Sequence, residues 1–309
     1  MLIIPRSAIT HPLTRFEMSS TIRIAMLNAD TPVPVVRPNY PTYGQMFHNL
    51  LVAATSRLCP EIKIQSSYYD VVKSEFPESL ADVDVVLVTG SAASSYDDQE
   101  WIRLLDKYIL EIYTNHPRIK LFGSCFGHQI ICQSLLRRYG VRVEKDPNGW
   151  ELGVQEIELE AKFRAALGSN ELQVNSDLRL PKKIPETMRV QFIHADHVKI
   201  PSPPALPESW LMVGRTEHCG VQGVFQSNRV LTLQGHFEFD RWISTEIMKV
   251  FGASWQPMEL KKTFEAIDAD DDAEAAAELV LQFFLEKERN GDSMTYQVAK
   301  GLLTPPLNA

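Results

Sequence analysis

The 309-residue sequence predicts an α/β fold in which a doubly wound, mainly parallel sheet carries antiparallel additions. The first observation is that short apolar runs alternate with helical patterns over residues 22–136. This alternation is typical of parallel strands joined by right-handed helical crossovers. The second is that strand patterns with less helix between them follow from residue 141 onward, which is typical of antiparallel strands added to a parallel core. Functional residues in such a fold are expected beyond the carboxyl ends of the parallel strands.

Apolar periodicity predicts the individual elements along the chain. In the first half, strands are predicted at residues 22–27, 62–72, 83–88 and 119–122, and helices at 43–58, 98–113 and 130–136. In the second half, strands are predicted at 141–143, 153–160, 188–193, 221–225 and 229–234. Residues 161–185 are expected to form an irregular or partly helical insertion, and residues 201–207 a proline-rich loop. An acidic run from Asp268 precedes an amphipathic helix at 275–287, and its carboxylates complement the dipole of that helix.

Three units are expected along the chain. Residues 21–255 carry the alternating pattern and are predicted to form one α/β domain, and residues 256–309 a C-terminal helical extension packed on it. Residues 1–20 are expected to be a flexible N-terminal extension. They contain two arginines and a single acidic residue, so a weak targeting segment is the alternative.

Composition and charge exclude several functions. A formal net charge of −8 argues against nucleic-acid binding, which needs clustered Lys and Arg, and no apolar stretch has the length needed to span a bilayer. The four cysteines have neither disulfide-pairing nor metal-ligand spacing, and there is no Gly-x-x-x-x-Gly-Lys-Ser/Thr phosphate loop. The sequence therefore predicts a cytoplasmic protein without a cofactor or metal.

The most informative segment is Gly-Ser-Cys-Phe-Gly-His-Gln at residues 123–129, because it places Cys125 at the tip of a strand-to-helix turn. Flanking glycines allow a strained turn and let the following helix pack closely on the sheet. A helix N-terminus lowers the pKa of a cysteine, and its free N–H groups can bind an oxyanion. Cys125 is therefore the candidate nucleophile.

A nucleophilic cysteine needs a base, and the base needs a group that orients it. The predicted strand at 229–234 is followed by His236 and Glu238. Residues two apart on an extended segment point in the same direction, so the carboxylate can bind one ring nitrogen while the other faces the thiol. These three residues predict a Cys-His-Glu triad.

The two motifs, at residues 123–129 and 234–238, resemble those of the class I glutamine amidotransferases, which hydrolyse the side-chain amide of glutamine. Two further segments resemble this family: Val-Thr-Gly-Ser at 88–91 and His-Ala-Asp-His-Val at 194–198. Gly-Trp-Glu-Leu-Gly at 149–153 resembles a small stand-alone branch that includes plant γ-glutamyl peptidases and fungal amidotransferase-like proteins. The resemblance implies a flavodoxin-like class I glutamine amidotransferase fold for the domain at 21–255. Phe237 departs from the pattern, since many relatives carry proline there.

The resemblance also implies roles for residues around the triad. The backbone N–H groups of Gly90 and Phe126 would hold the oxyanion, because two donors are the usual minimum. Gln129, which follows Cys125 by one helical turn, would contact the amino-acid end of the substrate, and Ser91 and Trp150 would contribute to substrate binding. His194 and Asp196 are assigned a structural role beside the site rather than a catalytic one. The remaining cysteines are expected to be inert: Cys59, Cys132 and Cys219.

The expected function is hydrolysis of a γ-glutamyl amide through a thioester. Glutamine is the substrate that the resemblance favours, with a partner protein that accepts ammonia as one expectation, because the chain has no room for a synthetase domain. The alternative is a γ-glutamyl peptidase that acts on glutathione or its conjugates. A third hypothesis is a non-catalytic relative that keeps the fold as a binding or regulatory module.

Overall fold

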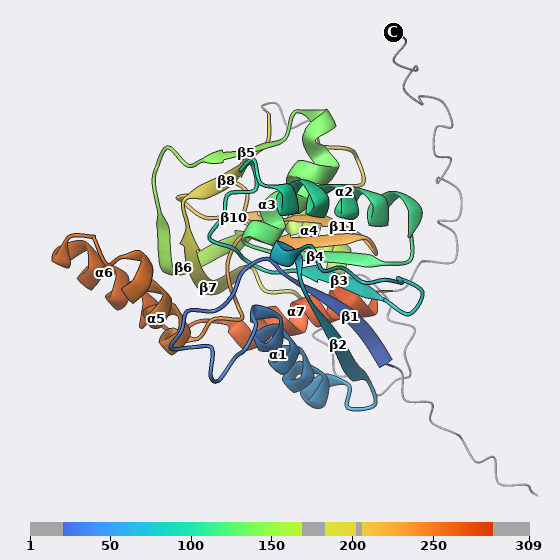
Figure 1. Ribbon diagram of the computed structural model, residues 1–309, viewed down its shortest axis with the longest axis horizontal. Helices are drawn as coiled ribbons and strands as arrows, with labels where there is room; N and C mark the ends of the chain where they lie inside the picture. Colours follow the sequence, from blue (N-terminus) through green and yellow to red (C-terminus); the bar gives the residue numbers. More distant parts are fainter. Residues whose placement is uncertain (1–20, 169–182, 202–205, 287–309) are drawn as a thin grey trace, which may run out of the picture.

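The computed structural model describes residues 21–168, 183–201 and 206–286 (Figure 1). In these ranges the central sheet has seven strands in the order β2-β1-β3-β4-β12-β11-β9. The first five of these run parallel to one another, β11 runs antiparallel to β12, and β9 pairs antiparallel with β11, so the predicted fold class is confirmed. In that order the strands are β2 (Lys63–Asp70), β1 (Thr21–Asn28), β3 (Val85–Val88), β4 (Lys120–Ser124), β12 (Val230–Leu233), β11 (Val224–Gln226) and β9 (Leu211–Met212).

Helices cover both faces of the central sheet, as a doubly wound fold requires. α1 (Tyr43–Leu58) and α7 (Ala273–Leu285) share one buried cluster with sheet residues such as Phe122. α2 (Glu100–Asn115) and α3 (Phe126–Leu136) share another with Leu121. Successive residues of β4 therefore enter opposite cores, because side chains alternate along a strand. None of the helices in the described ranges is long and apolar enough to cross a lipid bilayer.

Two smaller sheets stand beside the central one (Figure 1). β6 (Glu151–Leu159) lies between β7 (Thr187–His194) and β10 (Gly214–Arg215), and β5 (Arg142–Lys145) pairs with β8 (Asp196–Lys199). The remaining elements are α4 (Ala161–Gly168), α5 (Arg241–Phe251), α6 (Pro257–Ile267) and two short 3-10 helices, η1 (Val71–Lys73) and η2 (Arg137–Tyr139).

Most predicted elements are present, and their ends shift by a few residues. β8 was not predicted: β7 ends at His194, and β8 begins at Asp196 and pairs with β5. α5 was not predicted either. The two-residue strands β9 and β10 were also missed, because strands this short leave almost no periodic signal. The predictions for residues 1–20, for most of the 161–185 insertion and for much of the 201–207 loop fall outside the described residues.

The end of α7 is held by a buried lysine of the central sheet. The Lys120 ammonium group donates hydrogen bonds to the carbonyl oxygens of Phe283, Phe284 and Glu286, at 2.6–2.8 Å. The first two carbonyls belong to the last helical turn and the third to the residue that follows α7, a region where carbonyl groups run short of intrahelical donors. Lys120 therefore caps α7 and fastens it to β4.

Glycines let α3 approach the sheet at the turn after β4. A Cβ atom on Gly127 would lie 2.2 Å from the carbonyl oxygen of Val88 on β3, and one on Gly123 would lie 2.4 Å from the Gly127 carbonyl. Both distances are far below van der Waals contact. Only glycine permits this spacing between α3 and the ends of β3 and β4.

We predict that Gly127→Ala lowers the free energy of unfolding by about 1–3 kcal/mol, because the added methyl group must displace backbone rather than a flexible side chain. Gly220→Ala is the matched control, since a Cβ atom there would meet no atom within 4 Å. Urea unfolding monitored by circular dichroism measures both variants. Equal midpoints for the two would contradict the close packing inferred here.

Candidate active site

Cys125 lies at the N-terminus of α3 in a strained backbone conformation, with φ 51° and ψ −108°. Its backbone N–H donates to Leu233 O of β12 at 2.9 Å, and its own carbonyl accepts from Gln129 N at 3.0 Å. Such strain in a non-glycine residue persists only where the surrounding structure enforces it. The side chain is 6% exposed and lines a cavity.

His236 and Glu238 follow β12, the parallel neighbour of β4, and lie near Cys125 at the carboxyl ends of these two strands. His236 Nδ1 lies 2.7 Å from Glu238 Oε1, and the same imidazole lines one cavity with Cys125. Both His236 and Glu238 are 4% exposed. Ser124 Oγ donates to the same carboxylate oxygen at 3.4 Å. The structure therefore brings together the three residues that the sequence singled out.

Two phenylalanines, one after His236 and one after Glu238, help to hold the His236 imidazole in place. Phe237 is buried in the core with its ring 5.2 Å from that of Phe47, and His236 exchanges backbone hydrogen bonds of 2.7 and 3.1 Å with Gln191. The segment is thereby held without the proline of many relatives. Phe239 stacks on the imidazole with ring centroids 4.2 Å apart and planes 11° apart. Sequence reasoning missed Phe239, because only the fold places its ring against His236.

The electrostatic environment favours a protonated imidazole. Burial alone would lower the pKa of His236, but the Glu238 carboxylate, the negative charge of the Cys125 thiolate and the hydrogen bonds to both residues outweigh it and raise the pKa. Opposite charges this close in a buried site stabilise one another strongly. The arrangement is suited to a thiolate–imidazolium pair oriented by a carboxylate.

The residues expected to form the oxyanion site lie beside this pair. A Cβ atom on Gly90 would come within 3.0 Å of His236 Cε1 and 3.6 Å of Cys125 Cβ, so glycine leaves room for the ring. Thr89 Oγ1 donates to the Gly90 carbonyl at 3.1 Å and orients that peptide. Phe126 is the first residue of α3, where a backbone N–H has no intrahelical acceptor.

The cavity in front of Cys125 has a volume of ≈ 270 Å³ and contains charges of both signs. Ser91, Gln129 and Trp150, expected from the sequence, all line it. Its charged lining residues come from separate segments: Asp30, Lys145 and Asp196. Of these, the sequence pointed only to Asp196, with a structural role.

The wall formed by Gln129 and Asp196 is tightly hydrogen-bonded. Gln129 Nε2 donates to the Asp196 carbonyl at 3.0 Å and to Gln234 Oε1 at 3.1 Å. The Asp196 carboxylate accepts from the Ser94 hydroxyl at 2.5 Å and from the Tyr96 hydroxyl at 2.9 Å. Both amide donors of Gln129 are therefore occupied by the protein, and the residue holds α3 against β8.

A buried ion pair stands behind this wall. His194 Nε2 lies 2.9 Å from Glu151 Oε2, and His194 Nδ1 lies 2.9 Å from the Asp196 carbonyl. Burial would raise the pKa of Glu151, but His194 and hydrogen bonds from Thr216 and Gln222 outweigh it and lower the pKa. The contacts of His194 are directed at the protein framework, which agrees with a structural role.

The other cysteines lie in environments that disfavour a thiolate. Burial raises the pKa of Cys59 to about 11 and that of Cys219 to about 12, and it raises the pKa of Cys132 as well. Burial also lowers the pKa of His128 to about 3, so this histidine is neutral beside Thr232 Oγ1 at 2.8 Å. These groups are unsuited to proton transfer or nucleophilic attack near neutral pH.

The chain is similar to known proteins throughout this region. A glutamine amidotransferase-like protein of Schizosaccharomyces pombe is 27% identical over 270 residues, which cover 85% of this chain and 98% of that protein. γ-Glutamyl peptidase 3 of Arabidopsis thaliana is 26% identical over 67% of this chain and 74% of its own length.

Among solved structures, a glutamine amidotransferase from Thermotoga maritima matches with a TM-score of 0.59 and 17% identity, over 86% of this chain and 99% of that one. A second, from Methylobacillus flagellatus, matches with a TM-score of 0.54 and 15% identity, over 88% and 98%. At these identities the likeness concerns the fold. The family model for glutamine amidotransferase class-I matches residues 41–250, which is more than half of the sequence, and the chain therefore belongs to the class I glutamine amidotransferase family.

Proposed function

We propose that this protein hydrolyses γ-glutamyl amides, with Cys125 as nucleophile, His236 as acid and base, and Glu238 as the group that orients His236. The observation that carries the proposal is the position of the imidazole, which lines the same cavity as Cys125 and has its Nδ1 2.7 Å from the Glu238 carboxylate. A thiol, an imidazole and a carboxylate in this order form a triad for acyl transfer.

The acylation step begins when the Cys125 thiolate attacks the γ-carbonyl carbon of the substrate. The carbonyl oxygen becomes an oxyanion, which the backbone N–H groups of Gly90 and Phe126 stabilise. His236 then gives its proton to the leaving nitrogen, the carbon–nitrogen bond breaks, and ammonia or an amine departs. Cys125 is left as a γ-glutamyl thioester.

The deacylation step uses water and the now neutral imidazole. His236 removes a proton from the water molecule as its oxygen attacks the thioester carbon, and the carbon–sulfur bond then breaks. Glutamate leaves, and the thiolate–imidazolium pair is restored. Glu238 keeps its hydrogen bond to Nδ1 throughout, so that Nε2 faces the reacting atoms.

The charges of the cavity suit the amino-acid end of a glutamyl substrate. The Asp30 and Asp196 carboxylates can bind its α-ammonium group, and the Lys145 ammonium group its α-carboxylate, since all three residues line the same cavity as Cys125. Lys145 and Asp196 are paired across β5 and β8, which puts opposite charges side by side. We assign Ser91 and the carbonyl side of Gln129 to the same recognition region.

A second candidate substrate class is favoured by the rim of the cavity. The side chains of Tyr96, Trp150 and Phe251 line the cavity and are 45%, 42% and 41% exposed. Exposed aromatic rings give a large leaving group a surface on which to pack. A γ-glutamyl peptide such as a glutathione conjugate would place its remaining residues there, whereas glutamine releases only ammonia.

The substrate class is tested by comparing glutamine, glutathione and a glutathione conjugate with the purified chain alone, measuring glutamate release. We expect the γ-glutamyl peptides to be cleaved with kcat/KM at least equal to that of glutamine. Glutaminase activity that appears only with a second protein, without cleavage of any γ-glutamyl peptide, would instead establish an amidotransferase subunit. No hydrolysis and no adduct of a glutamine-like electrophile at Cys125 would favour the non-catalytic hypothesis.

We predict that Cys125→Ala lowers kcat by roughly a thousandfold or more, because no other group can form the thioester. Cys132→Ala is the matched control within the same helix and should keep nearly full turnover. Mass spectrometry of the electrophile-treated proteins should show an adduct on the control and none on Cys125→Ala. Substantial activity in Cys125→Ala would refute the nucleophile assignment.

We predict that Glu238→Gln slows turnover less than His236→Ala, because the carboxylate orients the base while the imidazole moves the proton. Glu238→Gln also removes the nearest charge that raises the pKa of His236. The imidazolium then loses its proton at lower pH, so the alkaline limb of the kcat/KM profile should shift to lower pH. An unshifted limb would show that Glu238 does not set the charge of His236.

A further inference from the structure

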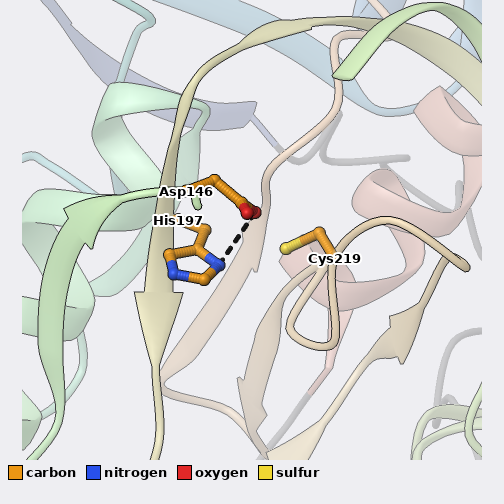
Figure 2. Close-up of side chains that lie close together, drawn as sticks. All are labelled: Asp146, His197 and Cys219. Atoms are coloured by element: carbon orange, nitrogen blue, oxygen red, sulfur yellow. Dashed lines mark ion pairs between the residues drawn. The ribbon is translucent and has the colours of Figure 1, made fainter. Parts of the chain in front are cut away.

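A second cluster of chemically active side chains lies behind the cavity wall (Figure 2). Asp146 follows β5, His197 is on β8, and Cys219 is in the loop between β10 and β11. Their ligand atoms all lie within 4.8 Å of one another, and all three residues are buried. In Figure 2 the Cys219 sulfur points toward the Asp146 carboxylate and the His197 ring from the opposite side. Three distant segments thus converge on one point.

The Asp146 carboxylate has an oxygen that the protein leaves unsatisfied. Oδ1 accepts the backbone N–H of Asn148 at 2.8 Å. Oδ2 is buried and makes no hydrogen bond of acceptable geometry within the described residues, although His197 Nδ1 lies 2.9 Å away. The Asp146 side chain is 0% exposed. The partners of this buried oxygen are thus histidine nitrogens without hydrogen-bond geometry, and a cation bound between them would compensate the buried carboxylate.

A fourth donor and an outer partner complete the surroundings. His218 lies outside the group of three whose ligand atoms are all within 4.8 Å of one another. Its Nε2 is 3.7 Å from Asp146 Oδ2 and has no hydrogen-bond partner within the described residues, and its side chain is 24% exposed. On the far side of the His197 ring, Glu144 Oε1 lies 3.6 Å from Nε2. Histidines that bind metals commonly have a carboxylate near the second ring nitrogen, which fixes the tautomer.

The types of donor select the ion. One thiolate, two imidazoles and one carboxylate match the sulfur, nitrogen and oxygen ligands of Zn²⁺, whereas Mg²⁺ and Ca²⁺ prefer sites built from oxygen alone. Four protein ligands fill a tetrahedral ion and leave no position for substrate. The chemistry therefore fits a structural ion.

We propose that Asp146, His197, His218 and Cys219 bind one Zn²⁺ ion. The ion would join the end of β5, β8 and the loop after β10 at a single point. Because successive residues of β8 face opposite sides, the strand presents Asp196 to the cavity and His197 to the ion. Zinc binding would thus hold the cavity wall in place from behind without taking part in the reaction.

The test measures zinc in the full-length, untagged chain carrying Cys125→Ala, so that the active-site thiol cannot bind the metal. Protein stripped with a chelator is incubated with Zn²⁺, passed through a desalting column and analysed for metal. We expect one zinc ion per chain in this protein and in the same protein with Cys59→Ser, a cysteine outside the cluster. Adding Cys219→Ser should abolish the bound zinc.

Cobalt provides a readout of the ligands themselves. Co²⁺ in the same background should give the intense visible bands of a tetrahedral ion together with a thiolate charge-transfer band, and Cys219→Ser should remove the latter. Glu144→Gln should weaken zinc binding by about 10–100-fold while leaving the four ligands intact, and this variant tests the site even if Cys219→Ser fails to fold. Absence of bound zinc, or an unchanged zinc content in Cys219→Ser, would overturn the proposal.

Discussion

The candidate site depends on how closely α3 approaches the ends of β3 and β4. Gly123 and Gly127 have no Cβ atom, and this absence lets the helix begin directly behind the strand. Cys125 is then forced to a φ of 51°, which lifts its sulfur out of the sheet and places it at the positive end of the helix dipole. A longer or looser turn would bury the thiol in the core or leave it far from His236.

The base is positioned by the same sheet rather than by a flexible loop. β12 pairs in parallel with β4 in a register that sets Leu233 opposite Ser124, so the residues after the two strands emerge together. Phe237 packs into the core, while His236 lines the cavity and the buried Glu238 carboxylate pairs with its ring. The backbone bridge between His236 and Gln191 restrains this segment.

The cavity wall is built from buried polar groups that satisfy one another. Glu151 lies at its centre, because it accepts from Thr216 and Gln222 and pairs with His194. The Asp196 carbonyl joins this network to Gln129 and hence to α3. Buried networks of this kind are stable only when nearly every member is paired. Gln222 Oε1 and Gln234 Nε2 of this wall nevertheless have no hydrogen-bond partner in the part of the chain that the structure describes, and neither has Asp146 Oδ2; the last of these lies beside His197 and Cys219, and this grouping motivates the zinc proposal.

Sequence patterns were sufficient for the alternating strands and helices, for the strained turn at Cys125 and for the pairing of His236 with Glu238, because these depend on neighbours within a few residues. They did not reveal β8, the stacking of Phe239 on His236, or the charged cavity residues Asp30 and Lys145. The spacing of the cysteines did not indicate the cluster of Asp146, His197 and Cys219 either. Each of these features joins segments that are distant in the chain, and only tertiary packing decides which distant side chains share one point in space.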